Sequence, residues 1–509
     1  MITAGVIDQA LACLQHVEQE LLLFTAFWLL MGACDDLGTD VAWLWLRLTG
    51  RARSVRLSSE ACDAPLTGRV AILVAAWHED EVIGHTIRHA LAAWRQQDFR
   101  LYIGCYANDP ATLAAAMDGV GQDTRVRLVV HSRHGPTTKA DCLNRLYDAL
   151  CEDERRWGQA FRCVVLHDAE DMVHSAELTV IDRTLDHADF VQLPVRAERE
   201  ARSRWVAGHY LDEFAEAHGK SLVVRDALGA ALPAAGVGCG FSRTMLARIA
   251  GQRVAAGGKG PFAAECLTED YELGVLVWRE GGKGRFVRAR DPQGRLVATR
   301  AYFPDRLEDS VRQKTRWIHG IAFQSWDRLG WSRIDGRAGL GASMADVWMA
   351  LRDRRGPLTA VILAASYLLI VVEAALAVLR LSGWQIAPMQ SPVLRIMLVA
   401  CAISLVWRCA FRALFTAREY GAMEGFLAVL RLPVANIIAI LATRRALTSY
   451  VRTLAGGAVV WDKTRHAAHP AAHPTGVPTE RQRAPQHRPA MAVPSMRGVA
   501  APDAMRTAA

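Results

Sequence analysis

The sequence predicts an α/β domain with a mainly parallel sheet, flanked by apolar helices that associate with a membrane. Two observations lead to this prediction. Between residues 65 and 350, segments with strand patterns alternate with segments of helical spacing. Residues 358–379 then form an apolar run whose only charge is Glu373, and this run is long enough for the roughly 20 residues that a membrane span needs.

Composition narrows the class of protein. The 509 residues allow two or three domains, 51% of them are hydrophobic, and the net charge is +8. A positive chain suits an anionic substrate, anionic lipid or nucleic acid. No nucleic-acid-reading motif occurs, so we expect no nucleic-acid partner. The 11 cysteines include no C-x-x-C pair, which indicates a reducing compartment.

Three apolar strands and two helices are expected in the first half of the domain. A parallel sheet binds its ligand beyond the carboxyl ends of its strands. The functional side chains should therefore follow the strands directly. The strands are "RVAILVAAW" (69–77), "RLYIGCYAND" (100–109) and "FRCVVLHDAED" (161–171), and the helices are "DEVIGHTIRHALAAW" (80–94) and "KADCLNRLYDAL" (139–150).

Membrane segments are expected at both sides of this domain. The apolar stretch 21–34 is short for a span and is interrupted by Asp35 and Asp36, so a tilted helix and a membrane hairpin both remain open. Residues 393–416 form a second, more charged span, and 425–442 suit an interfacial or re-entrant helix. The predicted divisions are a membrane segment (1–60), a cytoplasmic domain (61–350), a membrane region (351–464) and a disordered basic tail (465–509).

Acidic and amide groups follow each predicted strand, in "WHED", "YAND" and "HDAED". For Asp80 and Asp109, capping of the next helix is an equally good interpretation. Three acids directly after an apolar strand repel one another unless a cation lies among them. We therefore expect Mg²⁺ or Mn²⁺ at Asp168, Glu170 and Asp171.

Two further motifs lie later in the domain. In "CLTEDYELG", Glu269 and Asp270 open a helix, either as simple first-turn acids after an N-cap at Thr268 or as a positioned general base. In "VRQKTRWIHG", Gln313, Arg316 and Trp317 share one helix face. Such a face suits a flat, polar, anionic ligand.

The ordered set of "KADCLN", "DAED", "GVGCGFSR", "TED" and "QKTRW", followed by membrane helices, resembles the family 2 glycosyltransferases of the bacterial inner membrane. Cellulose, hyaluronan and poly-N-acetylglucosamine synthases are examples. Three segments are most similar to sequences of the bacteriophage adsorption protein B group: "HGPTTKADCLN", "LHDAEDMVH" and "RQKTRWIHGIAFQSWDRLGW". The resemblance runs from about residue 65 to the "WDKT" at 461–464, and it implies a GT-A nucleotide-sugar-binding fold.

The resemblance also implies residue roles. Asp168 and Glu170, with Asp171 adjacent, stand where the family holds a metal on the nucleotide diphosphate. Asp270, next to Glu269, stands where the catalytic base accepts the proton of the acceptor hydroxyl. The expected donor- and acceptor-binding residues are Glu79, Asp109, Lys139, Gln313, Arg316 and Trp317.

The implied activity is inverting transfer of a hexosyl or N-acetylhexosaminyl group. The donor is expected to be a UDP-linked sugar, and the acceptor an exopolysaccharide, a cell-surface glycan or a lipid-linked glycan. The implied setting is the inner membrane, with several spans, a cytoplasmic catalytic domain, membrane lipid around it and an outer-membrane or periplasmic export partner. The alternative function is a non-catalytic membrane scaffold or phage-receptor or secretion partner derived from a transferase.

Three departures from the family pattern qualify these roles. The metal motif is D-A-E where the family has D-x-D, so Asp171 is a further candidate ligand. The first strand ends in "AAWHED", where many relatives have Pro and Asn. Fuller-length members continue into a domain that senses cyclic di-GMP, whereas a Pro- and His-rich tail follows here, so such regulation is expected to be absent or supplied by a separate protein.

Overall fold

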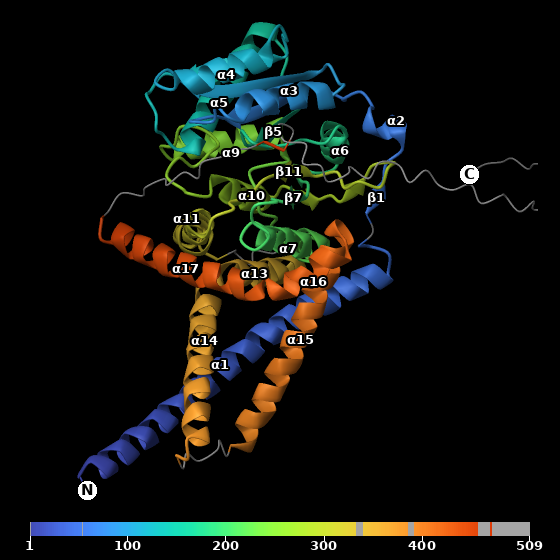
Figure 1. The fold of residues 1–509 in the computed structure, drawn as a ribbon. Coiled ribbons are helices and arrows are strands. Elements are labelled where there is room, and N and C mark those ends of the chain that lie inside the picture. The colour runs from blue at the N-terminus through green and yellow to red at the C-terminus, as the bar shows by residue number, and fades with distance from the viewer. Residues whose placement is uncertain (1, 53, 332–338, 385–390, 457–468, 471–509) are drawn as a thin grey trace, which may run out of the picture. The chain divides into compact units, whose positions relative to one another are not determined.

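The computed structural model describes residues 2–52, 54–331, 339–384, 391–456 and 469–470 (Figure 1). Residues 1–473 form one compact unit. The "WDKT" segment and the predicted basic tail from residue 465 lie outside the described residues, apart from His469 and Pro470. The predicted boundaries at residues 60, 350 and 464 stay predictions.

Within the described residues, the central sheet has seven strands in the order β4-β3-β2-β5-β8-β6-β9. β8 runs antiparallel to both of its neighbours, and the other pairs are parallel. The expected mainly parallel sheet is therefore confirmed. Its strands are β2 (Val70–Ala75), β3 (Phe99–Tyr106), β4 (Val126–His131), β5 (Cys163–His167), β6 (Phe190–Gln192), β8 (Cys239–Ser242) and β9 (Gly284–Phe286).

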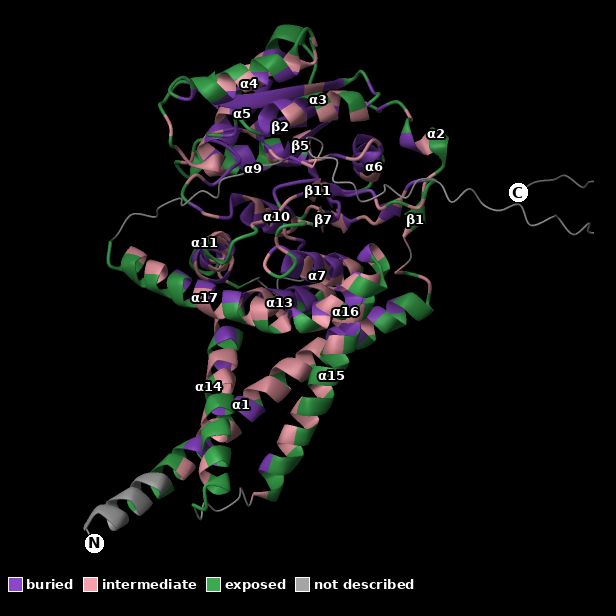
Figure 2. Ribbon diagram, in the orientation of Figure 1, coloured by how far each residue is buried: buried purple, intermediate pink, exposed green. Residues whose placement is uncertain are grey.

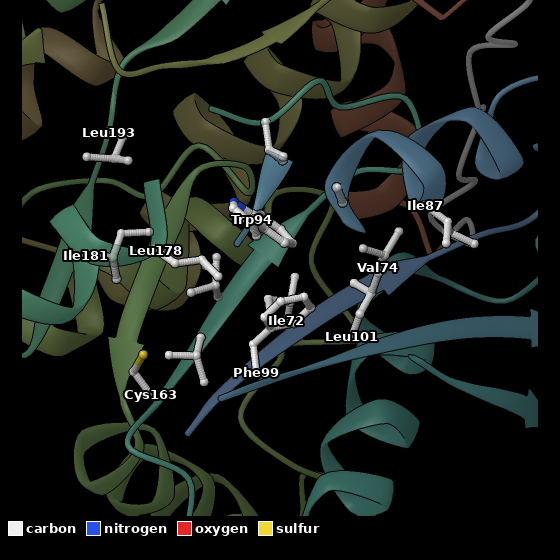
Figure 3. Packing of buried hydrophobic residues seen from close by; sticks show 14 of the residues in the cluster. Ile72, Val74, Ile87, Trp94, Phe99, Leu101, Cys163, Leu178, Ile181 and Leu193 are labelled. Atoms are coloured by element: carbon white, nitrogen blue, oxygen red, sulfur yellow. The ribbon is translucent and has the colours of Figure 1, made fainter. Parts of the chain in front are cut away.

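The sheet is covered on both faces, which explains why its central strands are apolar throughout. Successive residues of β2 alternate between two hydrophobic clusters, because side chains in a strand point to opposite faces. Ile72 and Val74 belong to the cluster that also holds residues of α3 and α6 (Figure 3). Ala71 and Leu73 belong to the cluster that holds residues of α5, α9 and α10.

The helices of this domain begin close to where the sequence predicts them. The predicted helix at 80–94 is α3, and the one at 139–150 extends about two turns further as α5. They are α2 (Ser59–Cys62), α3 (Ile83–Ala93), α4 (Pro110–Val120), α5 (Lys139–Trp157), α6 (Glu177–Thr184), α7 (Gly208–Glu216), α8 (Leu222–Ala227), α9 (Arg243–Ala255), α10 (Glu269–Arg279), α11 (Leu307–Ile318) and α12 (Ser325–Leu329).

Two small parallel ribbons and two π-helical turns complete the domain. β1 (Val55–Arg56) pairs with β10 (Ala289–Arg290), and β7 (Val195–Ala197) pairs with β11 (Thr299–Ala301). The π-helical turns are η1 (Ala217–Ser221), between α7 and α8, and η2 (His319–Gln324), between α11 and α12. Single π-helical turns inside α-helices occur frequently at functional sites.

Among the described residues, three helices are long and apolar enough to cross a membrane. They are α1 (Ile2–Leu48), α14 (Gly356–Leu381) and α15 (Pro392–Tyr420). Only 17% of the most apolar window of α14 and 6% of that of α15 is buried, so their side chains are left for lipid to cover (Figure 2). α1 is one continuous helix that runs through Asp35 and Asp36. The alternative of a membrane hairpin is therefore wrong.

Ion pairs explain how the acidic pair fits inside the apolar helix α1. Asp36 pairs with Arg352 at 3.1 Å and with Arg355 at 2.6 Å, at the junction between α13 (Leu340–Arg354) and α14. Asp36 also pairs with Arg408 of α15. The acids therefore lie where the three apolar helices approach the α/β domain, and the apolar run of α1 lies N-terminal to them.

A layer of helices lies between the α/β domain and the apolar helices in Figure 1. It consists of α13, α16 (Ala422–Leu430) and α17 (Leu432–Leu454). α16 and α17 are bent by 51° at their junction, and as a bent pair they would add a fourth candidate span. Arg431 at this bend is buried and forms a bidentate ion pair with Asp212 of α7.

Candidate active site

A cavity of about 620 Å³ lies beyond the carboxyl ends of β2 and β5. Its walls include ten of the eleven predicted site residues: Glu79, Lys139, Asp168, Glu170, Asp171, Glu269, Asp270, Gln313, Arg316 and Trp317 all line it, whereas Asp109 does not. Residues up to 238 positions apart in the sequence therefore meet in one place. Their roles remain predictions, which the geometry below makes more specific.

The turn after β2 presents Trp77 and Glu79 to the cavity, with His78 between them. His78 has a φ of +53°, a backbone conformation that is uncommon for residues other than glycine. Its N–H donates to Asp109 Oδ2 at 2.6 Å. The Glu79 N–H donates to the hydroxyl of Thr112 at 2.9 Å. These two bonds hold the turn in place.

Asp109 is therefore a residue of the supporting structure. Its carboxylate caps the N-terminus of α4 by accepting from the Thr112 N–H, as the helix-cap interpretation predicts. Burial opposes the charge of Asp109, but hydrogen bonds from Thr112 and His78 hold its pKa below the usual range. The charged carboxylate acts on the cavity through the turn that carries Trp77 and Glu79.

A lysine and two aspartates form the charged centre of the cavity. Lys139 opens α5 and forms an ion pair with Asp168, which follows β5. Burial opposes the charge of Lys139, but Asp168, Glu269 and Asp270 raise its pKa above the ordinary value. Gly236, at φ +73°, allows this approach: a Cβ there would lie 2.5 Å from Asp270 Oδ2 and 3.2 Å from Lys139 Nζ.

The loop after β5 is held by a buried histidine. His167 contacts Asp171 at 2.8 Å through Nδ1 and Glu177 at 2.6 Å through Nε2. Burial opposes the charge of His167, but Glu177 and Asp171 raise its pKa to about 10. Asp171 Oδ2 also accepts from the Asp168 N–H. The Asp171 carboxylate is thus already engaged, whereas the Asp168 side chain is 34% exposed.

The two acids of "TED" stand in the first turn of α10, and their surroundings make them better proton acceptors. Burial, together with the neighbouring Asp270, raises the pKa of Glu269, and burial, opposed by Lys139, raises that of Asp270. A carboxylate with a raised pKa is a stronger base near neutral pH. The hydroxyl of Thr268 does not cap this helix, so the capping interpretation fails for that side chain.

Gln313, Arg316 and Trp317 line the cavity from one face of α11, as their spacing predicts. Gln313 is 8% exposed, and its Oε1 has no hydrogen-bond partner among the described residues. The Trp317 ring packs edge-on against Tyr210 at 6.2 Å between centroids. This face therefore presents an amide, a guanidinium and an indole together to the cavity.

Sequence reasoning missed the aromatic walls of the cavity. At one wall, the ring centroids of Trp77 and Tyr106 lie 4.9 Å apart. At another, the ring centroids of Phe214 and Phe303 lie 4.8 Å apart. The "AAWHED" motif offered a signal for Trp77, because an aromatic residue follows a buried strand directly. Nothing in the sequence connects Phe214 with Phe303, since they come from α7 and from the loop after β11.

The charged centre fits a divalent metal bound together with a substrate. Among the described residues, no group of three His, Cys, Asp or Glu side chains is arranged to hold a metal ion. Mg²⁺ is usually bound by one or two carboxylates plus waters and substrate phosphates. Asp168 and Glu170 both line the cavity and supply two such carboxylates, whose oxygens are hard ligands. The donor set therefore fits a metal that arrives with a phosphate-bearing ligand.

Comparison with known proteins defines the class. Residues 67–320 match the model of the family described as glycosyltransferase like family 2. Residues 67–320 therefore form a domain of this family, and all the cavity-lining residues except Ile321 and Asp353 lie within it. The resemblance drawn from the motifs is confirmed.

One particular protein is similar over most of the chain. Bacteriophage adsorption protein B of Escherichia coli strain K12 is 32% identical over 467 residues, which covers 85% of this chain and 60% of that protein. Bacteriophage N4 adsorption protein B of Escherichia coli O157:H7 matches with the same identity and coverage. The chain thus spans 60% of the length of these curated relatives.

Solved structures with related folds are more distant. A mannosyltransferase from Pyrobaculum calidifontis, in complex with GDP-Man and Mn²⁺, has a TM-score of 0.47 and 14% identity, covering 80% of this chain and 99% of its own. A glucosyl-3-phosphoglycerate synthase from Mycobacterium tuberculosis has a TM-score of 0.32 and 17% identity, covering 54% of this chain and 84% of its own. Similarity this low carries no conclusion about the site.

Proposed function

We propose that this protein transfers a hexosyl or N-acetylhexosaminyl group from a nucleotide-sugar donor to a growing exopolysaccharide or cell-surface glycan, with inversion at the anomeric carbon. One observation carries the proposal: a carboxylate with a raised pKa (Asp270), a metal-ligand pair (Asp168 and Glu170) and a cationic aromatic face (Arg316 and Trp317) surround one cavity. A base, a leaving-group site and a sugar-binding face are the parts that glycosyl transfer needs.

In the proposed reaction, Asp270 accepts the proton of the acceptor hydroxyl while the hydroxyl oxygen attacks the anomeric carbon. The bond from that carbon to the diphosphate breaks, and the electron pair leaves with the diphosphate. Arg316 and Gln313 stabilise the departing charge through hydrogen bonds. Asp168 and Glu170 would hold Mg²⁺ or Mn²⁺, which when bound neutralises the diphosphate charge. Burial and the neighbouring Asp168 keep Asp270 basic, and Glu269 lies beside it in the first turn of α10.

The aromatic walls support the binding of two flat ligands. Trp77 and Tyr106 suit a nucleobase, because aromatic rings stack on its π-face. Glu79 stands beside them for polar contacts with the nucleotide. Trp317 and Phe303 suit the apolar face of a pyranose ring. For the donor we propose a UDP-linked sugar, and for the acceptor a glycan or a lipid-linked glycan.

We propose the bacterial inner membrane as the location, with the catalytic domain in the cytoplasm. Arg352, Arg355 and Arg408 gather at the domain end of the apolar helices, and cytoplasmic flanks carry such an excess of arginine. The similarity to bacteriophage adsorption protein B supports a role for the product at the cell surface, where phage adsorb. Delivery of a glycan there requires an export partner in the periplasm or outer membrane.

The test is release of nucleoside diphosphate by the detergent-purified protein with Mn²⁺ or Mg²⁺, across a panel of UDP- and GDP-linked sugars. Asp270→Asn should reduce turnover about a hundred- to ten-thousand-fold, since the base is lost, while nucleotide binding persists. Asp305→Asn, which changes an exposed aspartate, is the control and should stay active. Absence of release by folded, monodisperse wild-type protein would contradict the proposal and favour the scaffold function.

A further inference from the structure

The π-helical turn η2 lies directly against the loop that carries the proposed base. Gly320, in the first turn of η2, faces Thr268, the residue before Glu269 and Asp270. A Cβ at position 320 would lie 2.5 Å from Thr268 Cγ2 and 2.9 Å from Thr268 Cβ. Real Cβ atoms essentially never approach so closely, so either the loop or η2 would have to move.

Three polar contacts fasten the same two segments together. The Gln324 side-chain oxygen accepts from the Leu267 N–H at 3.0 Å. Arg328 of α12 donates to both oxygens of Glu272 at 2.8 and 3.0 Å. Arg328 also donates to Glu265 at 2.8 Å. The segment 265–272 is thus held on both sides of Asp270 by Gln324 and Arg328, which lie C-terminal to "QKTRW" in η2 and α12.

The opposite side of this element contacts the helix layer next to the apolar helices. Tyr450 of α17 stacks on Phe323 of η2, with ring centroids 4.8 Å apart and planes 12° apart. Its hydroxyl donates to Asp327 of α12 at 2.6 Å. The element 319–328 is therefore held between α17 and the loop of the proposed base.

We propose that residues 319–328 form a positioning element, in which the contact between Gly320 and Thr268 sets the distance between Asp270 and the Arg316–Trp317 face. The inference rests on the proposed function, because Asp270 must be the base. The widened turn matters because Arg316 and Asp270 lie on different helices, and η2 continues α11 while it contacts Thr268 at the start of α10. Misplacement of a reacting group by about 1 Å can cost about a hundred-fold in rate.

The contact is tested with Gly320→Ala. In an ordinary helix this change is favourable, so any loss must come from the contact. We expect the turnover number to fall about ten- to a hundred-fold, while the affinity for nucleoside diphosphate, measured by titration with Mn²⁺ present, and the melting temperature stay close to wild type. Gly251→Ala in α9, where a Cβ meets nothing within 4 Å, is the matched control and should leave turnover and nucleotide affinity unchanged while the melting temperature rises slightly.

The compensating change is Thr268→Gly, which removes all the atoms that the new Cβ would meet. The double variant Gly320→Ala, Thr268→Gly should recover most of the lost turnover. An active wild type combined with a fully active Gly320→Ala variant would overturn the inference, and so would a double variant without recovery. If Gly320→Ala does not fold, Arg328→Met replaces it, with the same expected loss of turnover at unchanged nucleotide affinity. An inactive wild type would instead contradict the proposed function itself.

Discussion

Lys139 forms an ion pair with Asp168, and the charge of Asp270 reaches the same ammonium group. The ammonium group of Lys139 thus interacts with both the proposed metal ligand, Asp168, and the proposed base, Asp270. Gly236 makes this possible, since it leaves space beside both Lys139 Nζ and Asp270 Oδ2. The arrangement places a positive charge where the diphosphate of the proposed donor would bind beside carboxylates.

Lys139→Met should lower the affinity for nucleoside diphosphate at least about ten-fold, because one lost interaction of about 1.4 kcal/mol corresponds to that factor. The physical reason is that Asp168, Glu269 and Asp270 would then face the diphosphate without a neutralising cation. Titration calorimetry with UDP in the presence of Mn²⁺ measures the change. Lys259→Met, at an exposed position, is the control. Equal affinities of the two variants would contradict the role of Lys139.

Gly236→Ala should reduce both stability and turnover. The positive φ costs about 1–2 kcal/mol for any residue with a Cβ, and the new methyl group would also press on Asp270 Oδ2. Gly257→Ala separates the two effects, because Gly257 has a φ of +88° but open space around it. Both variants should lose a few degrees of melting temperature. A loss of turnover beyond about ten-fold is expected in Gly236→Ala alone, and a similar loss in Gly257→Ala would argue against the contact.

The stability of the protein should fall as the pH drops from 6.5 towards 4. Burial lowers the pKa of His209 from 6.5 to about 4, so the folded state stays neutral while the unfolded state takes up a proton in this window. The lost stability amounts to about 2 kcal/mol at pH 5. His209→Phe should therefore lose less stability between pH 7 and pH 5 than the wild type does, as measured by denaturant unfolding at both pH values.

The control for this measurement is His187→Asn, which changes an exposed histidine. Its loss of stability between the two pH values should equal that of the wild type. Identical losses in His209→Phe and the wild type would show that His209 does not titrate between folded and unfolded states as its burial implies.

The strand ends illustrate what a sequence can predict. β2, β3 and β5 are apolar runs, and parallel strands carry the residues that follow them to one edge. The sequence pattern therefore predicts that Asp168 and Glu79 lie in one site, and both line the cavity. The helical period likewise predicts that Gln313, Arg316 and Trp317 share one helix face. Asp109 was harder, because a carboxylate after a strand can cap the next helix or bind a ligand, and only its hydrogen bonds to His78 and Thr112 distinguish the two.

Local pattern alone determined the mainly parallel sheet, the motifs that line the cavity and the apolar helices, because periodicity and the position of polar groups are properties of short segments. Only the tertiary structure decided that α1 continues through Asp36. The carboxylate of Asp36 accepts a hydrogen bond from Arg355, which lies 319 residues later in the chain. The tertiary structure also decided that Gly320 meets Thr268 and that Phe214 meets Phe303. Such contacts depend on how separate elements pack against one another, and the spacing of residues within one element does not contain that information.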